Sequence, residues 1–159
     1  MTFDIERFRA ASLAPRQARV PVPELAPFFE SGAEAVWVVR GLTGEEVARA
    51  NDANQRGALV INAVTALAAA SAVKSDQVDA MKTLLGCGED TPPDLAKRFD
   101  HLVYGSITPP IDRETAVRLF TGFPVVAYQL TNKILELTGL GADVGKAPHS
   151  MPTPASLLD

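Results

Sequence analysis

The chain contains two histidines, His101 and His149, and histidine is the side chain most often used as a general acid or base in catalysis. His101 follows Asp100 on a predicted helix near Tyr104, but no nucleophile or metal ligand stands where it would make this imidazole a catalytic base. His149 lies in a segment rich in Gly, Pro and Ser, which would not hold a catalytic geometry. We therefore interpret His101 as a structural side chain, at the surface or partly buried, and His149 as a solvated loop residue.

The remaining residue types that bind metals or attack substrates are equally scattered. Cys87 is the single cysteine, lies between two glycines, has no CxxC partner, and has no basic neighbour closer than Lys82. Two histidines and one cysteine at unrelated spacings do not form a zinc site, and the acids Glu89 and Asp90 lack the pattern of a calcium loop. We predict no catalytic residue, no cofactor and no metal ion, and we expect that the protein is not an enzyme.

A short glycine-containing turn, Gly41-Leu42-Thr43-Gly44, resembles a phosphate-binding loop only superficially. It lacks both the length of such a loop and its Lys-Ser/Thr ending. We interpret it as the connection between a strand and a helix.

Composition predicts one soluble domain with tails. The chain has 159 residues, of which 47% are apolar, 21% charged and only 6% aromatic, so the core must depend on Ala, Leu and Val. The net charge is −4 and no Lys/Arg run is present, which argues against a nucleic-acid partner. The charged N-terminus does not read as a signal peptide, and nowhere do eighteen apolar residues follow one another. We expect a cytoplasmic protein with no membrane partner.

Two extended segments predict a small β-hairpin at residues 18–42. Prolines limit Arg19–Pro23 to an edge strand, whereas Ala35–Leu42 is rich in β-branched and aromatic residues. Alternation places Trp37 on one face of the second strand with apolar residues on both faces. Trp37 is therefore either a core residue, which we favour, or part of an interface.

The remainder of the chain predicts a mostly α-helical bundle of about five helices. Thr43 and Glu46 form a capping box that opens a helix to about Val73, with Gly57 as a weak point. Further helices are expected from residues 75 to 85, from 91 to 103 with a stop at Gly105, and from an Asp112 cap; residues 106–111 are expected to be a loop. The fifth helix runs over residues 123–141.

The fifth helix is the most strongly patterned part of the chain. Val126, Leu130, Ile134 and Leu137 share one face, Pro124 fits the first turn, and Gly139 is expected to end the helix with a positive φ. We place an N-terminal arm at residues 1–17, one helical domain at 18–141, and a flexible C-terminal tail at 142–159. Only Leu157 and Leu158 suggest a contact within that tail.

The segment YQLTNKILELTGLG, preceded by a short predicted helix and the residues FPV, resembles the C-terminal end of siphovirus-type bacteriophage tail assembly chaperones. The apolar strand followed by RGLTGEE resembles their front half, so the similarity covers roughly Pro21–Gly141 in outline. These proteins are small and are encoded just ahead of the tape measure protein. The family commonly also has a frameshift-extended form, and the C-terminal tail would be a natural place for such an extension.

The resemblance implies a chaperone that covers apolar helical segments of the tape measure protein, keeps them soluble, and hands them to tail tube subunits. Its partners would be the tape measure protein, the tail tube protein and possible further copies of itself, in the host cytoplasm and absent from the finished virion. An alternative is a structural virion component, such as a head–tail connector or tail completion protein. As partner-binding residues, each with core burial as the alternative, we propose Trp37, Leu67, Phe120, Phe123, Val125 and Tyr128.

Overall fold

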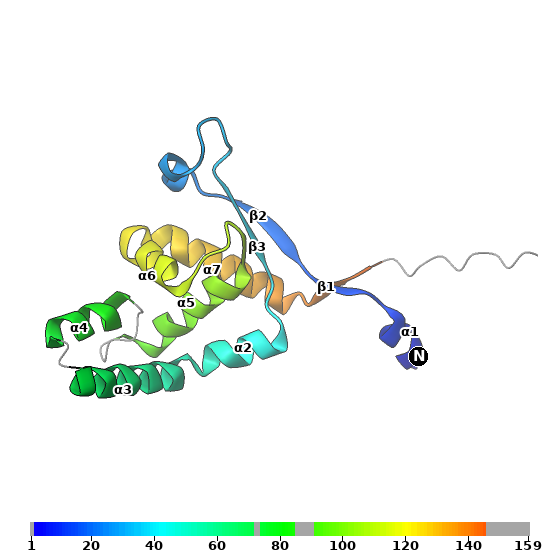
Figure 1. The fold of residues 1–159 in the computed structure, drawn as a ribbon. Helices are drawn as coiled ribbons and strands as arrows, with labels where there is room; N and C mark the ends of the chain where they lie inside the picture. Colours follow the sequence, from blue (N-terminus) through cyan, green and yellow to red (C-terminus); the bar gives the residue numbers. More distant parts are fainter. Residues whose placement is uncertain (1, 72–73, 85–90, 146–159) are drawn as a thin grey trace, which may run out of the picture.

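The computed structural model describes residues 2–71, 74–84 and 91–145, and it is mostly helical with a few short strands (Figure 1). We call the β2–β3–β4 sheet with helices α2, α5, α6 and α7 the body. The α3–α4 pair and the arm formed by α1, β1 and β5 lie at different ends of the body in Figure 1. In chain order the elements are α1 (Ile5–Ala10), β1 (Leu13–Pro15), β2 (Gln17–Pro21), the 3-10 helix η1 (Pro23–Phe28), β3 (Val36–Arg40), α2 (Gly44–Asn51), α3 (Ala53–Ser71), α4 (Ser75–Leu84), α5 (Pro93–Gly105), β4 (Ser106–Thr108), α6 (Arg113–Gly122), α7 (Pro124–Gly139) and β5 (Ala142–Val144).

The mostly helical class is confirmed, but the prediction of about five helices was too low. The described residues contain seven α-helices and one 3-10 helix. One reason is that the long helix predicted from Thr43 is two helices, α2 and α3. They separate at Asp52, which adopts φ −85° and ψ 7° and caps α2. The break therefore lies before Gly57, the residue that we expected to be weak.

The predicted hairpin is part of a three-stranded antiparallel sheet of order β2-β3-β4. β2 and β3 pair with Val20 opposite Trp37, and β2 is an edge strand, which fits the proline at its end, Pro21. Ser106 of β4 lies opposite Val39, so the segment that we predicted as a loop after α5 completes the sheet. Three residues before a Pro-Pro pair carry too little pattern to reveal a strand.

Helix α7 is the centre of the core. Val126, Leu130, Ile134 and Leu137 are buried as the spacing predicted, and α7 packs against α5, α6 and the sheet. Helix α5 can approach α7 closely because Gly105 has no side chain. A Cβ at this position would lie only 2.5 Å from the Ile134 side chain. The core is therefore tightly packed where α5 ends and β4 begins.

The end of α7 corrects one detail of the prediction. Gly139 is the last helical residue, Leu140 is the C-cap, and Gly141 takes the positive φ of +72°. The N–H of Gly141 donates to the carbonyl of Thr138 at 3.2 Å. The glycine with the positive φ is thus Gly141, two residues later than expected, for the same physical reason.

The arm joins the two ends of the described chain. Within the predicted N-terminal arm and C-terminal tail, β1 pairs with β5, with Ala14 opposite Asp143. An ion pair at 2.7 Å between Arg16 and Asp143 closes the base of this ribbon. Residues 142–144 of the expected tail are therefore a strand, whereas Cys87, His149 and the Leu157-Leu158 contact lie outside the described residues.

Candidate functional site

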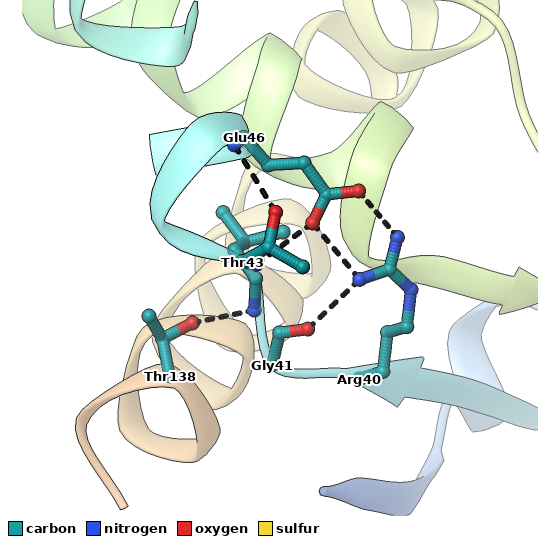
Figure 2. Close-up of polar contacts among 6 residues, drawn as sticks. Arg40, Gly41, Thr43, Glu46 and Thr138 are labelled. Carbon is teal, nitrogen blue, oxygen red and sulfur yellow. Dashed lines mark hydrogen bonds and ion pairs between the residues drawn. The ribbon is translucent and has the colours of Figure 1, made fainter. Parts of the chain in front are cut away.

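A polar junction lies where β3 turns into α2, the helix before α3, beside the end of α7 (Figure 2). Arg40 at the end of β3 donates two hydrogen bonds to the Glu46 carboxylate, at 2.6 and 2.9 Å, and a third to the Gly41 carbonyl. Glu46 also accepts from the Thr43 N–H at 2.8 Å, and the Thr43 hydroxyl accepts from the Glu46 N–H. The predicted capping box is thereby confirmed, with Arg40 added to it.

The junction favours the charged forms of its two ionisable groups. The hydrogen bond from Arg40 lowers the pKa of Glu46, against partial burial that would raise it. The same bond raises the pKa of Arg40. A bidentate Arg–carboxylate pair has a defined direction, so it orients α2 relative to the sheet.

Helix α7 holds the other side of the junction. The Leu42 N–H donates to the Thr138 hydroxyl at 2.9 Å, and a Cβ on Gly41 would lie 3.0 Å from backbone atoms of Leu137 and Thr138. Only glycine lets the turn come this close to α7. The turn that leads into α2 is thus held against the core by α7, and α3, which follows α2, packs against α5.

Helices α3 and α4 form an apolar groove of about 360 Å³. Hydrocarbon dominates its walls, with only the Ser71 hydroxyl and the Gln77 amide as polar side chains. We call it the α3–α4 groove, and its lining residues are Val64, Leu67, Ala68, Ser71, Gln77, Val78 and Met81. Of these residues Val78 is buried, whereas Leu67 and Met81 are exposed.

Helix α3 leaves an unusual amount of apolar surface in contact with water. Leu59 is 68% exposed and Leu67 is 66% exposed, while Ala63, Ala66 and Ala70 are exposed as well. On α4, Met81 and Leu84 add to this surface. A helix that is apolar on several faces is normally buried, so the α3–α4 pair has the character of an element that lacks a partner.

A second, smaller exposed apolar surface lies at the start of α7. Val125 is 76% exposed, and Tyr128 is partly exposed, with its ring against Phe120 and the Arg98 guanidinium 4.8 Å above its centre. Phe28 of η1 is exposed too and contacts the Phe123 ring edge-on at 5.9 Å. These rings already have intramolecular partners, so this surface is less in need of cover than α3.

The structure separates the six predicted partner-binding residues. Leu67, Val125 and Tyr128 are exposed, but only Leu67 belongs to the groove. Trp37 and Phe120 are buried and Phe123 is half-buried against the core, so we remove these three from the binding set.

Trp37 is held in the core by a specific contact. Its indole N–H donates to the Ser106 hydroxyl of β4 at 3.0 Å. Of the two alternatives considered for Trp37, core residue or interface residue, the structure therefore supports the core position.

The sequence reading overlooked Met81 and Leu84 as exposed residues. Their helix has modest amphipathic character, and an exposed apolar residue on it cannot be told from a core residue by spacing alone. On the neighbouring α3, the weak amphipathic character of the helix was a signal in the sequence that its apolar residues do not share one buried face.

His101 lies on α5, away from the α3–α4 groove lining. Its ring is buried, and Nδ1 has no hydrogen-bond partner among the described residues. Burial lowers the pKa of His101, with the nearby Arg98 adding to the effect, so the neutral form is favoured at pH 7. The neighbouring Asp100 forms an ion pair with Arg113.

Two further searches concern the described residues only. Within residues 2–71, 74–84 and 91–145, no three His, Cys, Asp or Glu side chains gather where they could hold a metal ion. No helix in these ranges combines the length and apolarity needed to cross a membrane.

Comparisons of the chain with models of known protein families, with curated proteins and with solved structures find no match.

Proposed function

We propose that this protein is a tail assembly chaperone that binds apolar helical segments of a phage tape measure protein in the α3–α4 groove. It would keep those segments soluble in the host cytoplasm until tail tube subunits replace it, and it would be absent from the finished particle. The observation that carries the proposal is the apolar, exposed and unpartnered surface of α3 and α4.

The groove has the chemistry that an amphipathic helix requires. Helix-in-groove recognition places apolar side chains at i, i+3, i+4 and i+7 of the ligand against hydrocarbon walls. Leu67 and Val64 offer such a wall on α3, and Met81, an unbranched and adaptable side chain, offers one on α4. Because the walls carry few polar groups, they would accept many apolar sequences with little selectivity.

Weak selectivity fits a chaperone that must later be displaced. A tape measure helix exposes apolar surface repeatedly along its length, and many modest contacts can cover it. Tail tube subunits that assemble around the same helix need only bind more tightly in total. Release then requires no chemical step, which agrees with our expectation that the protein is not an enzyme.

The proposal is tested by co-expressing the chain with the long helical protein encoded beside it and measuring how much of that protein stays soluble and co-purifies. We expect the wild-type chain to keep it soluble. The double substitution Leu67→Ser/Met81→Ser should lower the co-purified amount at least about tenfold, since each loses most of a buried apolar side chain worth about 1.5–3 kcal/mol.

Val125→Ser is the matched control, because Val125 is similarly exposed but lies on α7, away from the groove. It should leave co-purification unchanged. Equal binding by the groove variant and the wild type would contradict the proposal, and a loss with Val125→Ser alone would move the site to α7.

A structural virion component is the second candidate, and the exposed arm favours it, because protruding arms often join subunits in assemblies. Mass spectrometry of purified virions separates the two. The chaperone should be absent, whereas a connector would be present in the numbers of a ring.

A further inference from the structure

The arm carries two strongly exposed aromatic side chains. Phe3 is 73% exposed and Phe8 is 52% exposed, with their ring centres 5.5 Å apart, and Ile5 beside them is exposed as well. Helix α1 buries none of its residues. The β1–β5 ribbon that carries it is exposed at all six paired positions.

Such an arm is not expected to be stable by itself. A helix of six residues is far shorter than the roughly 12–15 residues that an isolated helix needs in water. A two-stranded ribbon alone is also marginal. The apolar face made by Phe3, Ile5 and Phe8 would therefore be stabilised if another surface covered it.

We propose that α1 of one copy docks in the α3–α4 groove of a second copy, so that the chains associate head to tail. Figure 1 shows α1 and the α3–α4 pair at opposite ends of the molecule, separated by the body, so an arm lies far from the groove of its own chain. The groove of another copy is the matching surface. This inference does not depend on the tape measure as a partner.

The apolar parts of the two surfaces match in kind. Phe3 and Phe8 present a pair of rings, and Met81 on the side of the groove offers a thioether, which makes favourable contacts with aromatic rings. Val78 and Leu67, which also line the groove, provide hydrocarbon for the rest of the ring surface.

The charges also match. The last turn of α1 carries Arg7 and Arg9, and α4 carries the exposed acids Asp76, in its first turn, and Asp79. Arg9 pairs with Glu6 of its own helix, whereas Arg7 makes no ion pair with the described residues. Docked α1 would bring Arg7 beside the acids at the rim of the groove, which favours this partner and its orientation.

A contact between two different surfaces leaves a free arm and a free groove after each addition. Such a heterologous contact produces a ring if the rotation closes and a growing chain if it does not. The groove could not hold an arm and another helix at once, so self-association and binding of a foreign apolar helix would exclude each other.

Sedimentation velocity of the full chain over about 1–200 µM tests the proposal. We expect wild-type protein to form concentration-dependent oligomers. The arm variant Phe3→Ser/Phe8→Ser and the groove variant Leu67→Ser/Met81→Ser should each be monomeric, and Val125→Ser should behave as wild type. These positions are exposed, so the variants are expected to keep their folds, which circular dichroism checks.

Mixing the two defective variants gives the sharper test. The arm variant retains a groove and the groove variant retains an arm, so an equimolar mixture should form a 1:1 heterodimer and nothing larger. Arg7→Glu should weaken self-association, and adding Asp76→Arg and Asp79→Arg should restore part of it. A monomeric wild type, oligomers that persist in either variant, or a mixture that stays monomeric would overturn the proposal.

Discussion

Helices α7 and α3 are both strongly apolar, yet α7 is the centre of the core, whereas Leu59 and Leu67 of α3 are mostly exposed. On α7 the apolar residues form a continuous stripe, and Leu130 and Ile134 are fully buried against α5, α6 and the sheet. On α3 the apolar and small residues do not form a single stripe, and Leu67, which lines the groove, is mostly exposed to solvent. The comparison teaches that a helix rich in apolar residues is not necessarily a core helix: without a stripe on one face, many of its apolar side chains can stay exposed.

The largest expected effect is in the body. Leu130→Ala should lower the free energy of unfolding by about 2–5 kcal/mol, because it removes a fully buried side chain from a tightly packed core. Urea denaturation followed by circular dichroism measures it. A loss below about 1 kcal/mol would show that α7 is no more essential to the fold than α3.

The next effect tests the close contact between the α2 entry and α7. Gly41→Ala should cost about 1–3 kcal/mol, since the new Cβ would lie 3.0 Å from backbone atoms of Leu137 and Thr138 that cannot easily move. Gly44→Ala is the matched control, because no atom lies within 4 Å of a Cβ there. Equal stability of the two variants would mean that α2 does not depend on α7 for its position.

The capping box should have a smaller effect that depends on pH. Glu46→Gln should cost about 1 kcal/mol at pH 7, because it removes the carboxylate that Arg40 and the Thr43 N–H bind. The folded-state pKa of Glu46 is lowered, so its contribution is present above the unfolded value and is lost as pH falls through the folded value. The stability difference from wild type should therefore shrink below about pH 4. A difference that stays constant from pH 7 to pH 3 would contradict this assignment.

The smallest expected effect on stability is at the groove. Leu67→Ser should change the free energy of unfolding by no more than about 0.5 kcal/mol, because the side chain is already mostly in water. Denaturation of this variant beside Leu130→Ala compares the two regions directly. A loss of 2 kcal/mol or more at Leu67 would show that α3 is part of the core.

Sequence patterns predicted the elements that are specified by nearby residues. The capping box of Thr43 and Glu46, the Asp112 cap, the Pro124 start and the buried stripe of α7 all depend on residues within a few turns of one another. The β2–β3 pair was also predictable, since its two strands are close in sequence and one of them is rich in β-branched residues.

The missed features depend on segments that are far apart in the chain. β4 is visible as a strand only through its pairing with Val39, and β5 only through β1 at the other end of the chain. Spacing also could not separate Trp37 and Phe120, which are buried, from Val125, which is exposed. Whether an apolar residue faces the core or a partner depends on what the rest of the fold covers.

Hydrogen exchange with and without a helical segment of the tape measure protein tests the central claim most directly. Amides of α3 and α4 should exchange quickly in the free protein and slow markedly on binding, because binding covers the α3–α4 groove, while those of α7 should be slow in both states. Unchanged exchange in α3 and α4 together with protection elsewhere, or no protection at all, would contradict the account.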